Sequence, residues 1–184
     1  AELKENDAKS LRNFNLAKAY IDSGMMTEAS EKLAILEKLL PEEAFVYANQ
    51  GLVALRQNEL EKAAALLAQA DALAPNKPSI ALLQGQVAML TGQFEDAKRI
   101  LTNAIAARPK NIQLRWALAN QLRGDHGQIE HLEVIVNIIE QNIVARLALI
   151  KALIADEQFD VALNHMLVLQ EQGVIQDEQA MDLF

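Results

Sequence analysis

The chain has 184 residues, with 17 basic and 25 acidic side chains and a formal net charge of −8. This acidic balance argues against nucleic-acid binding, which needs clustered Lys and Arg, and against docking on anionic lipid. Because the chain has no cysteine, disulfide scaffolds and thiol-based metal or catalytic sites are excluded. Ala and Leu outnumber β-branched and aromatic residues, which predicts an all-α fold.

The sequence carries no targeting or membrane signal that can be read from its hydropathy. No apolar run approaches the roughly 20 residues of a membrane span, and no signal-peptide pattern is present. We therefore expect a soluble protein without membrane insertion, in either the cytoplasm or the periplasm. The first residue is Ala1 rather than Met, which suggests a processed chain or a fragment of a longer protein.

Small and turn-forming residues recur every 34 residues along the first part of the chain. Two segments with helical apolar periodicity flank each turn position, at 44–57 and 60–73 in the second copy. We expect these segments to form antiparallel helices, joined by a residue in the left-handed conformation and ended by proline. The columns are Ala17, Gly51 and Gly85; Gly24, Asn58 and Gly92; Ala29, Ala63 and Ala97; Leu33, Leu67 and Leu101; Pro41, Pro75 and Pro109.

A 34-residue helix–turn–helix unit with these columns resembles the tetratricopeptide repeat. The resemblance covers three copies, at 10–43, 44–77 and 78–111. It implies a right-handed superhelical solenoid of antiparallel helix pairs, in which the first helix of each pair lines a concave groove that binds peptides. At the early first-helix position where the family favours Trp or another large apolar residue, the copies hold Asn13, Tyr47 and Ala81.

The pattern weakens after Asn111. Residues 112–142 predict a degenerate helix pair without the Ala and Pro columns, and residues 143–175 predict a pair closer to the repeat. Residues 176–184 predict a short capping helix, so that the whole chain, 1–184, is expected to form a single solenoid. At the other end, we expect the first helix to open between Asp7 and Ser10.

The residues that usually carry chemistry are few and scattered. His126 and His131 are five residues apart, which does not match the spacing of a helical metal pair, and His165 stands alone. No phosphate-binding loop, nucleophile elbow or HExxH motif occurs. We therefore predict no catalytic residue, no metal and no cofactor, and expect a chain that is not an enzyme.

The groove positions are the candidate functional residues, and they follow from the resemblance. The family's carboxylate clamp requires Lys and Asn at set positions, but only Lys18 and Asn49 match, so this mode is disfavoured. What remains is a largely apolar groove with an aromatic anchor and isolated cations, suited to a mainly apolar peptide or helix. The predicted groove residues are Phe14, Lys18, Phe45, Leu52, Leu55, Arg56, Leu82, Gln86, Met89, Trp116, Asn120 and Arg123.

Two functions are thus open from the sequence. The first is a non-catalytic protein–protein interaction scaffold whose partner is a protein or peptide of unknown identity. The second is a structural module that forms a homodimer or packs on neighbouring domains of a larger protein. The Ile- and Val-rich stretch 129–139 motivates the second, because its apolar residues occupy more than one helix face.

Overall fold

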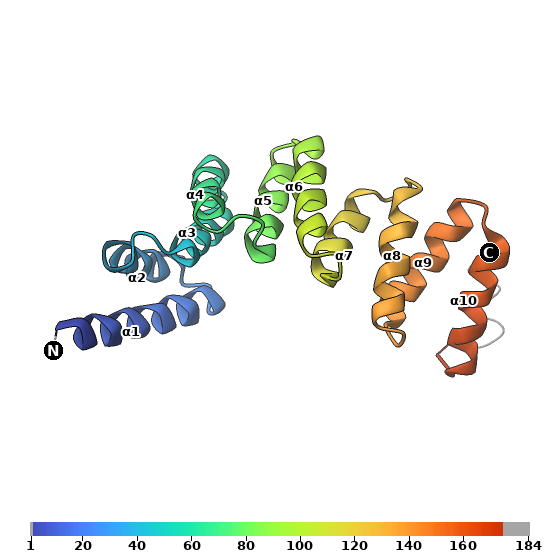
Figure 1. The fold of residues 1–184 in the computed structure, drawn as a ribbon, viewed down its shortest axis with the longest axis horizontal. Coiled ribbons are helices and arrows are strands. Elements are labelled where there is room, and N and C mark those ends of the chain that lie inside the picture. Colours follow the sequence, from blue (N-terminus) through green and yellow to red (C-terminus); the bar gives the residue numbers. More distant parts are fainter. Residues whose placement is uncertain (1, 175–184) are drawn as a thin grey trace. The chain divides into compact units, whose positions relative to one another are not determined.

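A computed structural model describes the chain from residue 2 to residue 174, with side chains described from Asp7 onward. Over this range every regular element is an α-helix, which confirms the predicted all-α class (Figure 1). Within it, no helix is both long and apolar enough to cross a bilayer. The predicted capping helix at 176–184 lies outside the described residues. The helices are α1 (Glu2–Asp22), α2 (Met26–Leu39), α3 (Ala44–Arg56), α4 (Leu60–Leu73), α5 (Pro78–Leu90), α6 (Phe94–Ala107), α7 (Ile112–Gln121), α8 (Gly127–Ile138), α9 (Ile143–Ala155) and α10 (Phe159–Glu171).

The helices group into two compact units, residues 1–107 and residues 108–184, which we call unit 1 and unit 2. In unit 1, α1 packs on α2, α3 on α4 and α5 on α6, while α2 contacts α3 and α4 contacts α5. In unit 2, α7 packs on α8 and α9 on α10, and α8 contacts α9. Each unit is therefore a stack of helix pairs in which a pair contacts its neighbour along the chain, as a solenoid requires.

The turn between the two helices of a pair has the same backbone geometry in all three copies of unit 1. Gly24, Asn58 and Gly92 have φ values of 77°, 61° and 76°. In each turn, the N–H of the next residue donates to a carbonyl five residues earlier at 2.8 Å, for example from Glu59 to Ala54. This bond closes the first helix in the manner of a Schellman motif. The predicted left-handed turn position is confirmed.

The small-residue columns lie where the two helices of a pair approach each other. Ala29, Ala63 and Ala97 have no exposed surface. Leu67 is fully buried and its side chain covers Gly51 on the facing helix. Alanine and glycine therefore let the helix axes come close, and the leucine of the second helix fills the space that remains.

We expect Gly51→Ala to destabilise the protein and Gly85→Ala to change its stability little. A Cβ at residue 51 would lie 2.7 Å from Leu67 Cγ, whereas a Cβ at residue 85 would lie 3.3 Å from Leu101 Cγ. Overpacking costs about 1–3 kcal/mol, and replacing glycine by alanine inside a helix returns up to about 1 kcal/mol. Urea unfolding followed by circular dichroism measures both variants. Equal losses of stability would contradict the difference in packing.

The start of the first helix differs from the prediction. Helix α1 begins at Glu2 rather than between Asp7 and Ser10. The reason is that residues 2–5 are Glu, Leu, Lys and Glu, all good helix formers, with no Pro or Gly to stop the helix. Sequence periodicity alone could not detect this extension, because it adds little to the apolar pattern.

Candidate functional site

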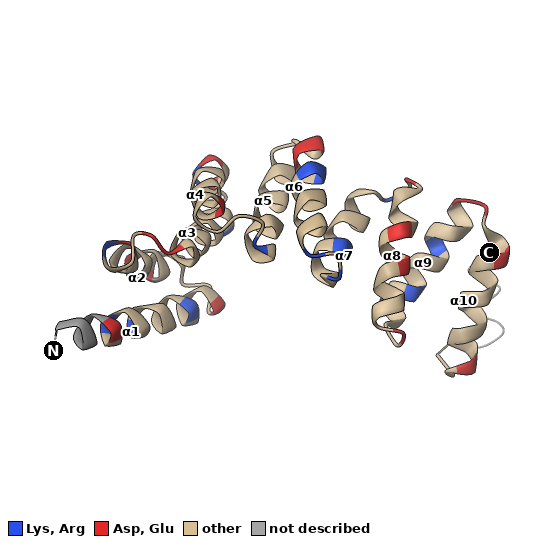
Figure 2. Ribbon diagram, in the orientation of Figure 1, with Lys and Arg blue, Asp and Glu red and all other residues tan. Residues whose placement is uncertain are grey.

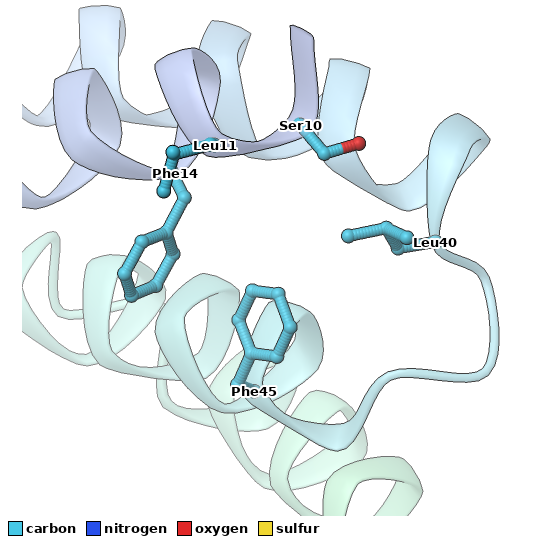
Figure 3. A pocket seen from close by; sticks show the side chains of 5 residues that line it. All are labelled: Ser10, Leu11, Phe14, Leu40 and Phe45. Atoms are coloured by element: carbon cyan, nitrogen blue, oxygen red, sulfur yellow. The ribbon is translucent and has the colours of Figure 1, made fainter. Parts of the chain in front are cut away.

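Two neighbouring apolar pockets open on the first helices of the pairs in unit 1. The first pocket has a volume of about 330 Å³ and lies between α1 and α3. In it, Phe14 and Phe45 point toward each other from facing helices (Figure 3), with ring centroids 5.2 Å apart and an interplanar angle of 84°. This edge-to-face arrangement is one that aromatic pairs favour. The lining residues are Ser10, Leu11, Phe14, Leu40 and Phe45.

The second pocket has a volume of about 200 Å³ and lies between α3 and α5. Phe45 lines both pockets. The two pockets together therefore form one surface across α1, α3 and α5, which we call the Phe45 groove. The residues lining the second pocket are Phe45, Ala48, Asn49, Leu52, Lys77, Ser79, Ile80 and Leu83.

The Phe45 groove is apolar and carries a single ionisable side chain. Among its lining residues, all of which the structure describes, only Lys77 is ionisable. Helix α3 has Arg56 as its one charged residue, and α5 has none. The Nδ2 of Asn49 donates to its own helix, at the Phe45 carbonyl 2.7 Å away. The groove thus offers apolar surface with one cation at its α5 end.

Of five predicted groove residues on α1 and α3, three line the groove and two do not. Phe14, Phe45 and Leu52 line it. Leu55 is instead buried in the core of unit 1, because the last turn of α3 faces α4 and α5. Arg56 is exposed but lines neither pocket, and its Nη1 donates to the carbonyl of Ile21 near the end of α1. For Leu55, the structure thus corrects the expectation of a groove-facing, ligand-accessible side chain.

The remaining predicted residues of unit 1 line neither pocket. Lys18 and Gln86 are exposed, and Leu82 and Met89 are half-buried. Several lining residues were not predicted from the sequence. On α5, the register projected from the family is offset by one or two residues, and the projection does not include the segments that precede helices. The missed residues are Ser10, Leu40, Lys77, Ile80 and Leu83.

The three predicted residues of unit 2 lie on α7 and the turn that follows it. Trp116 is half-buried and packs against the core of unit 2, which includes Leu132 and Leu149. Asn120 and Arg123 are exposed. Trp116 therefore contributes to the stability of unit 2, whatever else it binds.

A position early in three of the first helices, α3, α7 and α9, has a shared structural role that the sequence did not reveal. Tyr47 donates from Oη to the carbonyl of Pro41 at 2.7 Å, six residues back. In unit 2, Arg115 Nε donates to the carbonyl of Pro109 at 2.6 Å, and Arg146 Nη2 donates to that of Glu140 at 2.8 Å. Each side chain thus ties its helix to the loop that precedes it, which satisfies a carbonyl the helix cannot reach.

Arg115 and Arg146 also contact histidines on the second helices of unit 2. Arg115 Nη1 lies 3.1 Å from His131 Nδ1, and Arg146 Nη1 lies 3.0 Å from His165 Nδ1. Burial lowers the pKa of His131; Glu130 counteracts this effect and Arg115 adds to it.

Burial also lowers the pKa of His165. The Arg146 guanidinium lowers this pKa further, and Glu133 raises it in part. Both arginines are buried, with exposures of 9% for Arg115 and 6% for Arg146. The spacing of the histidines in the sequence gives no indication of these pairs with arginine.

The third histidine lies on the surface of unit 2. His126 Nδ1 is 2.8 Å from Asp156 Oδ2. Hydrogen bonds from Gln158 and His126 hold the pKa of Asp156 below its ordinary value. Among the described residues, no group of three or more His, Asp or Glu is placed to hold a metal ion.

Comparisons with known proteins agree on one architecture. Residues 54–122 match the family model for the tetratricopeptide repeat. A comparison with curated protein sequences finds no significant match.

Solved structures with a similar fold include MamA from Desulfovibrio magneticus RS-1, residues 41 to the end, with 19% identity and a TM-score of 0.71; it covers 92% of this chain and 97% of its own. PilW, a widely conserved type IV pilus biogenesis factor, has 20% identity and a TM-score of 0.74, covering 98% of this chain and 86% of its own. A variant of the O-GlcNAc transferase of Thermobaculum terrenum has 20% identity and a TM-score of 0.65 over 72% of this chain and 26% of the transferase.

At these identities the likeness to solved structures concerns the fold. The fold is nevertheless specific, because the 34-residue columns, the left-handed turns and the stacked helix pairs occur together. Repeats of this kind stack into surfaces that serve protein–protein contacts. The family match over residues 54–122 and the architecture of the helix pairs together establish that the chain contains tetratricopeptide repeats.

Proposed function

We propose that the chain is a non-catalytic interaction scaffold that binds a mainly apolar peptide or helix in the Phe45 groove. The observation that carries this proposal is the pair of apolar pockets joined at Phe45, about 330 and 200 Å³ in volume. Helices present apolar side chains at intervals of three or four residues, which suits two neighbouring pockets. An apolar anchor in each pocket would remove Phe14, Phe45 and Leu52 from water.

The charge of the groove selects among apolar partners. Lys77 lies at the end of the second pocket, and α3 and α5 bring no carboxylate to the groove. An acidic residue of the partner can pair with Lys77, whereas a basic residue there meets a like charge. Charges at the edge of an interface set orientation and association rate more than affinity. We therefore expect a partner whose apolar stretch is followed by Asp or Glu at the α5 end.

The composition of the groove also supports a binding role over catalysis. General acid–base chemistry needs a positioned group that gains and loses a proton near neutral pH. Lys77 stands alone among the lining residues, without a neighbouring carboxylate or histidine in either pocket. Apolar lining with few polar groups is typical of recognition surfaces.

A peptide selection tests the proposal. Random linear peptides displayed on phage are selected on the purified protein, and the affinities of the recovered peptides are measured by isothermal titration calorimetry. We expect apolar sequences with an acidic flank, and loss of binding in the double variant Phe45→Glu and Leu52→Glu. The matched control is Glu61→Gln on α4, outside both pockets. Peptides that bind the double variant as well as the unsubstituted protein would refute the groove.

A second candidate function is self-association, favoured by an exposed apolar face in unit 2. Leu163 and Leu167, one helical turn apart on α10, are each 46% exposed. Between Asp160 near its start and Glu171 at its end, α10 carries no acidic or basic residue except His165 (Figure 2). Large exposed apolar patches mark interaction sites. Such a face suits contact with a second copy of the chain or with another domain.

We expect Leu163→Glu combined with Leu167→Glu to lower any tendency of the protein to associate. Two carboxylates on an apolar contact would have to be desolvated without a partner, at a cost of several kcal/mol. Sedimentation velocity over a range of protein concentrations gives the oligomeric state of the unsubstituted chain and of the variant. A monomer at every concentration for the unsubstituted chain would rule out self-association through α10.

A further inference from the structure

The two Arg–His pairs of unit 2 form a repeated device that the proposed binding function does not use. In both, a buried arginine on a first helix bonds to a loop carbonyl six residues back and to a histidine on the second helix. Arg115 thus joins α7, its preceding loop and α8, and Arg146 joins α9, its preceding loop and α10. Each pair therefore connects the two helices of one repeat.

The chemistry of these contacts requires neutral imidazoles. A guanidinium has five N–H donors and no acceptor, so the ring nitrogen that faces it must accept. His131 Nδ1 lies 3.1 Å from Arg115 Nη1, and His165 Nδ1 lies 3.0 Å from Arg146 Nη1. Both rings must therefore carry their single proton on Nε2. A second proton on Nδ1 would remove the hydrogen bond and place two cations in contact.

Unit 1 has no counterpart to this device. All three histidines of the chain, at positions 126, 131 and 165, belong to unit 2. At the equivalent position, α3 uses the hydroxyl of Tyr47 to reach Pro41, while α1 and α5 hold Asn13 and Ala81. This contact contains no imidazole, the side chain whose charge ordinarily changes between neutral and mildly acidic pH.

We propose that unit 2 responds to acid: the two Arg–His pairs hold its helix pairs together only while both imidazoles are neutral, so that mild acidification loosens the unit. The effect would change the surface that α7 to α10 present, including Trp116 and the exposed face of α10. It is independent of the Phe45 groove, which lies in unit 1 and contains no histidine.

The charges around each ring determine the sign of the effect. His131 is acted on by Arg115 from α7 and by Glu130 on its own helix. His165 is acted on by Arg146 from α9 and by Glu133 from α8. Lys151, the other charged residue of α9, is exposed. Each histidine thus has one cation that opposes its protonation and one carboxylate that partly favours it.

With burial included, the pKa of both rings is lowered in the folded protein. The unfolded chain then binds protons at a higher pH than the folded one. The stabilisation is fully present above the ordinary histidine pKa of about 6.5 and is lost as the pH falls below it, toward the lowered folded values. The buried Nε of Arg146 has no hydrogen-bond partner among the described residues, so losing His165 would leave this guanidinium with the Glu140 carbonyl.

Trp116 provides a signal for unit 2, because it is the only tryptophan of the chain and packs on the core of that unit. Urea unfolding of the full chain is followed by its fluorescence at about pH 7.5 and about pH 5.5, on either side of the ordinary histidine pKa. We expect a lower urea midpoint at the acidic pH. In the double variant His131→Asn and His165→Asn, Oδ1 accepts near the position of Nδ1 and does not titrate, so the difference between the two midpoints shrinks.

The control is His126→Asn, which removes the exposed histidine that pairs with Asp156. Because His126 belongs to neither Arg–His pair, this variant should keep the acid-induced fall. The unsubstituted protein gives a second measurement that needs no variant to fold: NMR titration of the ring protons of His131 and His165 should show pKa values below that of a free imidazole. Equal midpoints at both pH values, the same fall in the double variant, or ring pKa values at or above the free one would each overturn the proposal.

Discussion

Replacing Leu149 with alanine is expected to lower the free energy of unfolding by about 2–5 kcal/mol. Leu149 lies on α9 with no exposed surface, in a core cluster that also contains Leu132, Ile135 and Leu153. Shortening its side chain removes apolar burial and leaves a cavity that the surrounding helices fill only in part. Helix α9 packs against both α8 and α10, so few residues of unit 2 are better placed to show this cost.

The measurement is urea unfolding followed by Trp116 fluorescence, which reports on the same core. The matched control is Leu167→Ala, the same substitution at a side chain that is 46% exposed in the same unit. We expect the control to change the free energy of unfolding by less than about 1 kcal/mol, as surface substitutions usually do. A loss for Leu149→Ala no larger than that of the control would show that the core lies elsewhere.

Phe45→Ala is expected to weaken peptide binding by about 30-fold or more. Phe45 lines both pockets and contacts Phe14 edge to face. Its removal therefore takes away the ring that both pockets share and the contact with Phe14. Truncation of a central aromatic anchor typically costs about 2 kcal/mol or more, and each 1.4 kcal/mol corresponds to about tenfold in affinity. Calorimetry with one selected peptide measures the effect.

The matched control for Phe45→Ala is Phe94→Ala, at the start of α6. Phe94 is 60% exposed and lines neither pocket, so its removal should leave the affinity unchanged within about twofold. Circular dichroism spectra of both variants separate a loss of binding from a loss of fold. Equal affinities for the two variants would mean that Phe45 is not the anchor of the groove.

The fold was largely predictable because each repeat has positions at which only a few residue types satisfy the packing. Gly or Asn is required where the backbone turns left-handed, as at Asn58, and Ala or Gly is required where helices meet, as at Ala63 and Gly51. These constraints recur every 34 residues, so the pattern is visible in one sequence. The start of α1 was not, because Glu2 to Glu5 form helix without an apolar pattern.

The site was predictable only in part. The projected register places Phe14, Phe45 and Leu52 in the groove, but it does not predict which atoms a long side chain contacts. Arg56 reaches a carbonyl 35 residues away in sequence, at Ile21, and such a contact leaves no local signal. Lys77 lines the second pocket just before α5 begins, where a pattern built on helix faces does not extend.

The role shared by Tyr47 and Arg115 could not be predicted from residue identities. The positions of Tyr47 and Arg115 share one hydrogen bond to a carbonyl six residues earlier. Tyrosine and arginine have little in common as residue types, so no column of identical letters points to this role. The common property is a long side chain that ends in a donor.

The most direct test of the groove is methyl NMR of the protein with a selected peptide added. Spectra of Leu, Ile and Val methyl groups are recorded as one peptide recovered from the selection is titrated. The account predicts that the largest shifts occur at Leu11, Leu40, Leu52, Ile80 and Leu83, which line the two pockets. Shifts confined to α2, α4 and α6, or to unit 2, would contradict a binding site on the first helices of unit 1.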